Sequence, residues 1–361
     1  MSLELLVLPG DGIGPEIAAA TRRMLEAADR RYDLGLSFET EAIGFESLAR
    51  EGTTLPARVL GRARAVDGVV LGPVSTAEYP PREQGGINPS AALRTGLDLY
   101  ANIRPSHTFQ GVPAPVGAMD LVIVRENTEG FYADRTMHAG TGEFMPTPDL
   151  ALAVRKISAH GSERAARMAG RLAIARRRRV TVVHKANVLK LSDGLFLSCA
   201  ERVLARELPE IAVDDEHVDA MASLLVRTPE RFDVVVTTNM FGDILSNLAA
   251  ELAGGLGLAA SLNLGDEHAV AQGAHGSAPE IAGQDRANPT SLVLSAAMLL
   301  KHLGERRNED RLVRAAVAIE RAITSQLAEA AGRTVDLGGP LGTAAFTDAL
   351  CARLAGAEIA A

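Results

Sequence analysis

Short apolar runs alternate along the chain with longer stretches in which apolar residues recur every three or four positions. The short runs predict β-strands at residues 3–8, 67–71, 121–124, 180–183 and 232–237. The longer stretches predict helices that begin near residue 15 and then at 162–176, 192–206, 243–252, 290–303, 309–330 and 347–354. This rhythm is typical of an α/β fold in which helices pack on a mostly parallel sheet.

One segment interrupts this alternation. Residues 134–148 contain two glycines and two prolines, and their apolar positions show little helical period. Such a composition is typical of a connection rather than of a packed helix. We therefore expect an arm that leaves the main sheet near residues 134–148.

Composition and charge exclude several classes of protein. Of the 361 residues, 23% are charged and 47% belong to the hydrophobic set, which excludes a disordered or fibrous chain. The 37 basic and 45 acidic residues give a formal net charge of −8, the wrong sign for a main partner that is a nucleic acid or an anionic membrane. The basic run Arg176–Arg179 is expected to be the solvated end of a helix, where cations are favourable.

The N-terminus has no basic region before its apolar run, and no apolar stretch is long and uninterrupted enough for a membrane helix. Cys199 and Cys351 are far apart and form no metal-binding or disulfide pattern. These features predict a protein of the cytoplasm that binds neither membranes nor nucleic acids.

Three arginines lie in apolar or constrained sequence settings: Arg94, Arg104 and Arg125. Arg125 ends an apolar strand, where an unpaired charge is costly and where ligands bind in open α/β sheets. Each arginine alone is more often part of a structural ion pair. Three of them in one stretch favour a bidentate clamp for a substrate with several carboxylates.

Oxygen ligands for a metal are also available. Asp243 and Asn247 are four residues apart and share one face of a predicted helix. Together with Asp219, which follows another strand, they could bind Mg²⁺ or Mn²⁺. Alone, Asp243 would be better explained as a first-turn carboxylate that stabilises the helix dipole.

The turn after the first strand, residues 10–16, contains three glycines and a proline suited to the first position of a helix. It lacks the spacing of a Rossmann fingerprint and the lysine of a phosphate-binding P-loop. From the residues alone, close approach to a ligand and a simple tight turn are equally good explanations.

Taken together, these segments resemble the β-decarboxylating dehydrogenases, the isocitrate, homoisocitrate and 3-isopropylmalate dehydrogenase family. The likeness covers nearly the whole chain, and its matching stretches are residues 10–16, 97–105, 124–132, 184–188, 218–222, 242–246, 275–279 and 288–289.

The resemblance implies a two-lobed α/β fold with a large mixed central sheet, different from a Rossmann fold. One lobe, from residues 1–99 and 256–361, would bind the cofactor. The other, residues 100–255, would bind substrate and metal and form a homodimer with shared active sites.

The resemblance also assigns roles to individual residues. Tyr132 and Lys185 match the family's acid and base, and the three arginines match its clamp on a substituted malate. Lys185 and Asp219 would reach the site of the neighbouring subunit. The residues that match its cofactor-binding positions are Ile13, Asn187, His275, Gly276, Ser277, Ala278, Glu280 and Asn288.

Cofactor and substrate preference can be inferred from a few positions. Glu280 would accept hydrogen bonds from the adenosine ribose of NAD and repel the 2′-phosphate of NADP. Isopropylmalate enzymes usually have leucines before the first arginine, whereas this chain has Asn88 and Ser90. These polar residues are the substrate-binding candidates that favour a polar substituent on the malate.

We therefore expect an NAD-dependent oxidative decarboxylation of a 3-substituted (R)-malate with Mg²⁺ or Mn²⁺, of the isocitrate or homoisocitrate type. A 3-isopropylmalate enzyme or a tartrate or malate enzyme is the alternative. Asn247 stands where the family has an aspartate, which motivates a further alternative, a non-catalytic regulatory subunit. An anion-binding module without redox chemistry would leave Lys185, Tyr132 and Glu280 without a role. The sequence leaves open whether dimers pair into tetramers.

Overall fold

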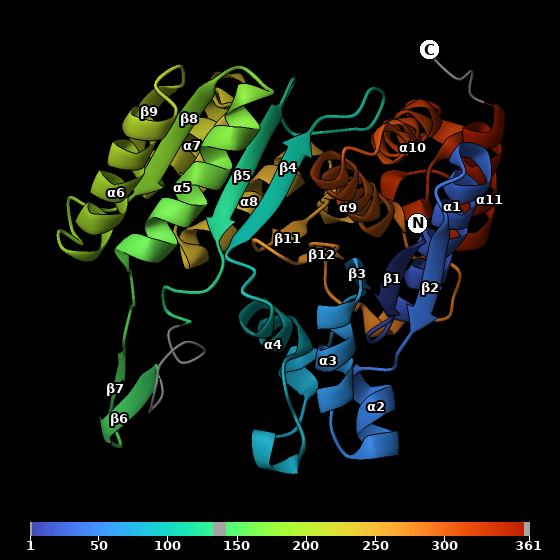
Figure 1. Cartoon of the computed structure of the whole chain (residues 1–361), viewed down its shortest axis with the longest axis horizontal. Coiled ribbons are helices and arrows are strands. Elements are labelled where there is room, and N and C mark those ends of the chain that lie inside the picture. Colours follow the sequence, from blue (N-terminus) through green and yellow to red (C-terminus); the bar gives the residue numbers. More distant parts are fainter. Residues whose placement is uncertain (1, 133–141, 357–361) are drawn as a thin grey trace.

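A large sheet runs through the whole molecule in a computed structural model that describes residues 2–132 and 142–356 (Figure 1). In those residues ten strands pair in the order β2-β1-β3-β12-β11-β4-β5-β10-β8-β9. Their bounds are β1 Leu3–Leu8, β2 Leu36–Thr40, β3 Gly68–Leu71, β4 Ala101–His107, β5 Asp120–Glu126, β8 Arg179–His184, β9 Ala212–His217, β10 Val234–Thr237, β11 Leu262–Leu264 and β12 Ala269–Gln272.

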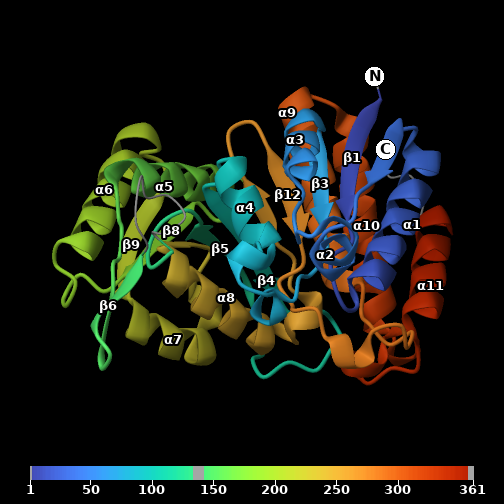
Figure 2. The same cartoon turned by 90° about the horizontal axis from the view of Figure 1, so that it is seen from below.

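Helices cover both faces of this sheet; Figure 2 shows α5 and α6 on one side of β8 and α7 and α8 on the other. The helices are α1 Gly14–Tyr32, α2 Gly44–Glu51, α3 Ala57–Ala65, α4 Pro89–Gly96, α5 Ala159–Ile174, α6 Ser192–Glu207, α7 Val218–Arg227, α8 Asn239–Ala253, α9 Thr290–Arg307, α10 Asp310–Ala328 and α11 Thr343–Gly356. The predicted α/β class with a large mixed sheet is confirmed.

Only the two ends of the sheet are parallel. The pairs β4 with β5, β4 with β11, and β11 with β12 are antiparallel, so the direction of the strands changes in the middle. In the described residues six of the nine strand pairs of this sheet are parallel, so the prediction of a mostly parallel sheet is confirmed. The apolar pattern did not detect β11, which has three residues, or the strands β4 and β12 beside it. The acidic edge strand β9 is the strand expected before Asp219, and it gives no apolar run because most of its side chains are polar.

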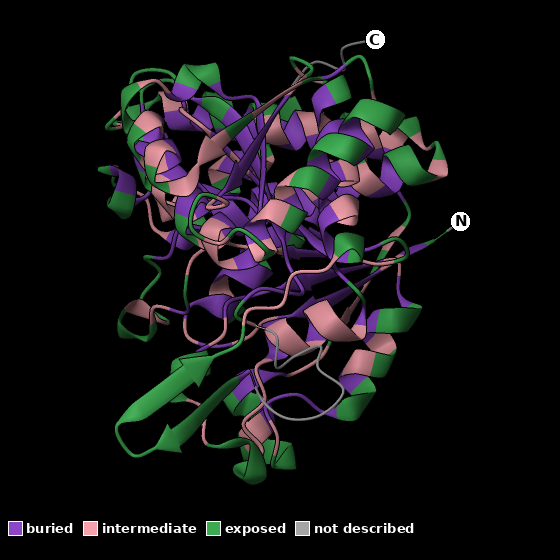
Figure 3. Ribbon diagram, turned by 90° about the vertical axis from the view of Figure 1, so that its left-hand side faces the viewer, coloured by how far each residue is buried: buried purple, intermediate pink, exposed green. Residues whose placement is uncertain are grey.

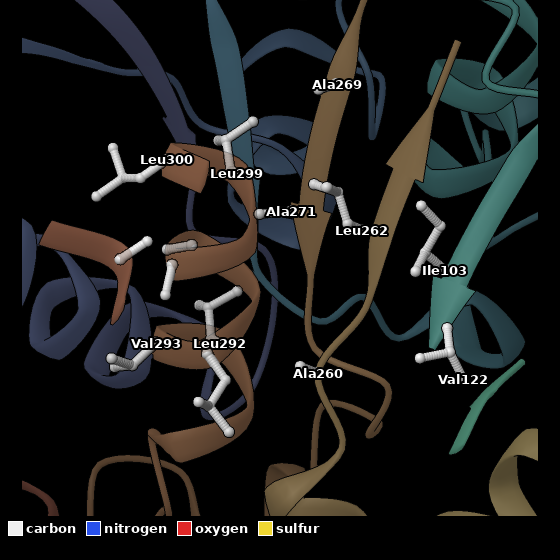
Figure 4. Close-up of a cluster of buried hydrophobic side chains, with 14 of the residues drawn as sticks. Ile103, Val122, Ala260, Leu262, Ala269, Ala271, Leu292, Val293, Leu299 and Leu300 are labelled. Carbon is white, nitrogen blue, oxygen red and sulfur yellow. The ribbon is translucent and has the colours of Figure 1, made fainter. Parts of the chain in front are cut away.

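The strands bury alternate residues on opposite faces, as the pleat requires. Leu5 and Val7 of β1 belong to the core beneath α1 and α9, whereas Leu6 and Leu8 belong to the core on the side of α3. Near the sheet centre, Figure 4 shows Leu262 of β11 between β4 and the helix α9. The core is therefore continuous across the change in strand direction.

A two-stranded antiparallel sheet, β6 Glu143–Thr147 and β7 Leu150–Ala153, lies away from the main sheet and is exposed along its length (Figure 3). Residues 134–141 of the predicted arm lie outside the described part of the chain. At the base of this hairpin, Gly130 and Lys156 exchange backbone hydrogen bonds of 2.8 and 2.9 Å. The division into two lobes stays a prediction.

The basic run after α5 is bound to a buried acid. Asp233 is 1% exposed and accepts hydrogen bonds of 2.8 Å from the Arg176 side chain and from the Arg177 backbone. Part of this run therefore closes the end of the helix. Within residues 2–132 and 142–356, no helix combines the length and the apolar character needed to cross a bilayer.

Candidate active site

Two of the predicted arginines lie side by side on one face of the sheet centre. Arg125 is opposite Asn102 in the β4–β5 pair, and Arg104 points to the same face two residues along. Their side chains are 3% and 9% exposed, and both contact the Asp243 carboxylate of α8, Arg104 at 3.2 Å and Arg125 more closely. The structure thus brings Arg104, Arg125 and Asp243 together.

Neighbouring polar groups hold both guanidinium groups in place. Arg104 donates to Ser246 at 2.7 Å and to Asn247 at 3.2 Å. Arg125 donates to the Asn239 side chain at 2.9 Å. A side chain at Gly242 would place its Cβ 2.7 Å from the Arg125 side chain, so a glycine allows α8 to approach the sheet here.

Positive charge exceeds negative charge in this group. Burial and the neighbouring charge of Arg125 lower the pKa of Arg104 to about 10, which still leaves it protonated at neutral pH. Two buried cations therefore face one carboxylate. Since a buried unpaired charge is costly, the arrangement is complementary to an anion with more than one carboxylate.

The remaining predicted substrate residues lie on α4. Asn88 caps this helix, because its Oδ1 accepts the Ala91 N–H at 3.0 Å. The Ser90 hydroxyl accepts a 2.8 Å hydrogen bond from Gln272. The structure places Arg94 in the last turn of the same helix, and it gives Asn88 and Ser90 partners within the protein.

Lys185 and Asp219 form a second group. Lys185 follows β8, Asp219 lies in the first turn of α7, and their side chains are 2.5 Å apart. This contact holds the pKa of Asp219 below its usual value, so the group is a carboxylate at neutral pH. Among the described residues, no hydrogen bond or ion pair links this group to Arg104, Arg125 or Asp243.

The predicted acid lies with the arginines instead. The ring of Tyr132 lies 5.8 Å from the Arg125 guanidinium carbon. Within one chain, the two residues predicted to transfer protons therefore belong to different groups. The geometry of a single chain offers the acid and the clamp together, without the base.

The predicted metal ligands are divided in the same way. Asp243 and Asn247 share a face of α8, but Asp219 lies in the other group, and the Asn247 oxygen accepts its bond from Arg104. In the part of the chain that the structure describes, no three His, Cys, Asp or Glu residues are arranged to hold a metal. One chain alone thus offers an incomplete set of oxygen ligands.

A separate cavity of about 200 Å³ collects most of the predicted cofactor residues. Ile13, His275, Gly276, Ala278 and Asn288 line it. Ile281, the neighbour of Glu280, also lines it, as do residues that the sequence did not single out: Gly257, Arg286, Ala287 and Asp336. Of these, Asp336 accepts a 3.0 Å hydrogen bond from Asn288, yet no motif surrounds it in the sequence.

The glycine-rich turn packs against the loop that carries His275. The Ile13 N–H donates to the Ser277 carbonyl at 2.8 Å, and the Ser75 and Ser277 hydroxyls are 2.7 Å apart. Gly12 has φ of +57°, and a Cβ there would lie 2.0 Å from the Ser277 oxygen. The turn therefore needs glycine at this position for contact between two loops at the edge of the cavity.

His275 carries an unpartnered acceptor in this cavity. Its Nδ1 lies 2.9 Å from the Gly276 carbonyl, which can only accept, so Nδ1 carries the proton. Burial lowers the pKa of His275, and its Nε2 is buried without a hydrogen-bond partner in the described structure. A hydroxyl or amino group of a nucleotide fits this acceptor.

Three predicted cofactor residues do not line the cavity. Ser277 contacts the glycine-rich turn through its carbonyl and its hydroxyl. Glu280 is exposed on the 3₁₀ turn Pro279–Ile281, beside Ile281. Asn187 is exposed on the loop of Lys185, away from the other cofactor candidates. Their roles stay predictions.

A family model described as isocitrate/isopropylmalate dehydrogenase matches residues 4–350. The chain belongs to this family. It is therefore an oxidoreductase, a decarboxylating dehydrogenase that acts on a substrate of the malate type.

Curated relatives and a solved structure agree with this assignment. Isocitrate/homoisocitrate dehydrogenase of Thermus thermophilus is 44% identical over 97% of this chain and 98% of its own length. 3-Isopropylmalate dehydrogenase of Sulfurisphaera tokodaii is 37% identical over 94% of this chain and 95% of its own. The crystal structure of isocitrate dehydrogenase from Methylococcus capsulatus superposes with a TM-score of 0.86 at 40% identity, covering 98% of this chain and 99% of that one.

The His275 acceptor predicts how cofactor affinity depends on pH. If neutral His275 accepts a hydrogen bond from NAD, the affinity for NAD stays constant above pH 6.5. It falls when the pH drops through the lowered pKa of His275, because the protonated imidazole no longer accepts. Isothermal titration calorimetry with NAD between pH 5 and 8 measures this dependence of the affinity on pH. His275→Leu should weaken binding about 10-fold and abolish the acid limb. An unchanged affinity in that variant would contradict the assignment.

Proposed function

We propose that this protein catalyses the NAD-dependent oxidative decarboxylation of a 3-substituted (R)-malate, with a tricarboxylate of the isocitrate or homoisocitrate type as its substrate. The observation that carries the proposal is the pair of buried guanidinium groups, Arg104 and Arg125, that share the single carboxylate of Asp243. The polar residues Asn88 and Ser90 on α4 support a polar substituent. The 44% identical relative, named for isocitrate and homoisocitrate, supports the same choice.

In this proposal the substrate carboxylates bind to Arg94, Arg104 and Arg125. Arginine suits this task because its planar fork can donate two parallel hydrogen bonds to one carboxylate. Burial of Arg104 and Arg125 fixes their direction before substrate arrives, which reduces the entropy lost on binding.

Two residues move the protons. Lys185 takes the proton of the substrate's α-hydroxyl, and Tyr132 gives a proton to the β-carbon after CO₂ has left. When bound, NAD accepts the hydride and a divalent cation held by Asp219, Asp243 and Asn247 stabilises negative charge on oxygen. The products are a 2-keto acid, CO₂ and NADH, and one proton is taken and one returned.

NAD is the proposed cofactor rather than NADP. Glu280 is exposed beside the cavity lined by Ile13 and His275, where it would repel a 2′-phosphate. The orphan Nε2 of His275 supports a nucleotide in this cavity. The proposed cofactor lobe, residues 1–99 and 256–361, contains both.

A homodimer with shared sites is part of the proposal. One chain separates Tyr132 from Lys185 and Asp243 from Asp219, so a second copy is needed to complete the site. Large apolar side chains near Lys185, Asp219 and Asp243 are exposed in the single chain, which a subunit interface that covers them would explain. They are Val188, Leu191, Leu195, Val226 and Ile244.

The proposed reaction is tested by measuring NADH production with Mn²⁺ and a panel of substrates. We expect the highest kcat/KM with isocitrate or homoisocitrate, a lower value with 3-isopropylmalate, tartrate and malate, and a strong preference for NAD over NADP. A higher kcat/KM for 3-isopropylmalate would favour the alternative function. Absence of turnover with every compound, in protein that binds NAD, would favour a regulatory subunit.

Shared sites predict complementation between inactive chains. Lys185→Met and Tyr132→Phe should each lose nearly all activity while NAD binding stays intact. A hybrid dimer would contain one intact site and one site with both changes. Since about half of the dimers in an equal mixture are hybrids, the mixture should regain up to about a quarter of wild-type activity. Subunit exchange is verified first by native mass spectrometry. Exchange without recovered activity would refute sites shared between subunits.

The amide at position 247 predicts a weak metal site. By charge counting, Asn247→Asp should lower the Mn²⁺ concentration for half-maximal rate several-fold. Asn247→Ala serves as the control for loss of the Arg104 hydrogen bond. If Asn247→Asp requires equal or more Mn²⁺, the residue acts by positioning Arg104 or a metal-bound water instead.

A further inference from the structure

A buried ion pair lies directly behind the loop that carries Lys185. Asp193, in the first turn of α6, is fully buried, and its Oδ1 contacts the Arg155 guanidinium. Its other oxygen accepts the Lys185 backbone N–H at 2.6 Å. The same carboxylate therefore joins Arg155 to the backbone of the proposed base.

Arg155 reaches two further segments of the proposed site. It lies next to Lys156 at the base of the β6–β7 hairpin, and its side chain is 9% exposed. Its guanidinium carbon lies 5.9 Å from the ring of Phe131 and 5.3 Å from the ring of Phe241. Phe131 precedes the proposed acid, Tyr132, and Phe241 lies two residues before Asp243.

Hydrogen bonds fix the orientation of this arginine. Its Nη1 donates to the Ser192 hydroxyl and its Nη2 to the Thr238 hydroxyl, both at 3.0 Å. Ser192 begins α6 and Thr238 caps α8. One guanidinium thus contacts the start of α6, the residue before Tyr132 and the start of the helix that carries Asp243. It reaches the loop of Lys185 through Asp193.

Stability alone is a weak explanation for this pair. Removing two charges from water costs several kcal/mol in general, and an apolar pair of similar volume is often equally or more stable. What an apolar pair cannot do is accept the Lys185 N–H and hold four segments at defined angles. The chain keeps the ions where the geometry of the site depends on them.

We propose that Arg155 and Asp193 are positioning residues that set the direction of Lys185 and the placement of Tyr132. Neither contacts a reacting group: Asp193 acts through the Lys185 backbone, and Arg155 through Asp193 and Phe131. This inference rests on the proposed roles of Lys185 and Tyr132 in the reaction.

The decisive variant replaces both ions together. Arg155→Met with Asp193→Leu removes the charges but keeps the volume apolar, so the protein should fold with a melting temperature near that of wild type. Its kcat should fall about 100-fold, as expected when a reacting group is misplaced by about 1 Å. The KM for the substrate and the Kd for NAD should change less than about 3-fold, since the clamp and cavity are untouched.

Matched single variants separate positioning from folding. Arg155→Lys can still pair with Asp193 and should keep most of the wild-type kcat, whereas Arg155→Met should lose it. The losses of kcat in the single variants Arg155→Met and Asp193→Leu should not add up in the double variant, because both changes break the same network. Arg167→Met, which removes a surface ion pair with Glu163 and Glu207, should leave kcat unchanged.

The pH dependence of kcat and the exchange of the Lys185 amide provide two further readouts. The acid limb of kcat should shift in the double variant, which a merely structural defect would not cause. Hydrogen exchange of the peptide that contains Lys185 should become faster in Asp193→Leu, since its N–H loses its acceptor. The amide measurement needs no turnover, so it tests the positioning of the loop even if no substrate in the panel reacts.

Two results would overturn the inference. One is a double variant with wild-type kcat and pH profile. The other is a double variant whose kcat is reduced only because fewer molecules are folded and bind NAD, with wild-type kcat per NAD-binding site. If Arg155→Met variants fail to fold, Asp193→Asn is the test variant and Arg155→Lys its conservative control. An unchanged kcat with unchanged amide exchange in Asp193→Asn would also reject the proposal.

Discussion

Burying two guanidinium groups beside one carboxylate is the constraint from which the site's architecture follows. Arg104 and Arg125 need polar partners because they lie below the surface of a sheet, and α8 supplies them through Asp243, Ser246 and Asn239. That helix can approach only because Gly242 has no side chain. The antiparallel pairing of β4 with β5 then sets the two arginines on one face.

The same excess of positive charge supports the proposed tricarboxylate substrate. A site with two buried cations and one partly exposed anion has the greatest affinity for a ligand that brings further carboxylates. The cavity proposed for the nucleotide has a mixed lining. It combines apolar residues with the neutral imidazole of His275 and the amide of Asn288, and it has one charged residue of each sign, Arg286 and Asp336. The two regions thus differ in charge: the proposed substrate site has the excess of positive charge that suits a tricarboxylate, whereas the charged residues of the proposed nucleotide cavity balance.

Much of this site could be predicted from the sequence, because its residues lie in short motifs. Arg125 was found from its position at the end of an apolar strand, and Asp243 from its spacing of four residues to Asn247 on one helix face. Asp336 was missed because it reaches the cavity from a 3₁₀ turn far along the chain, with no pattern around it. Arg155 and Asp193 were missed since a buried ion pair leaves no periodic signal. The central strands were missed because β11 is too short to show alternation.

The order of strands has a consequence for how the chain is assembled. The hairpin of β11 and β12 lies between β3 and β4, strands that precede it by more than 150 residues. Until residue 272 has been made, the sheet exists as two separate pieces whose facing edges, β3 and β4, have no partners. Open edges of this kind invite pairing with other chains. During synthesis, protection from aggregation therefore depends on one short hairpin that is added late and closes both edges at once.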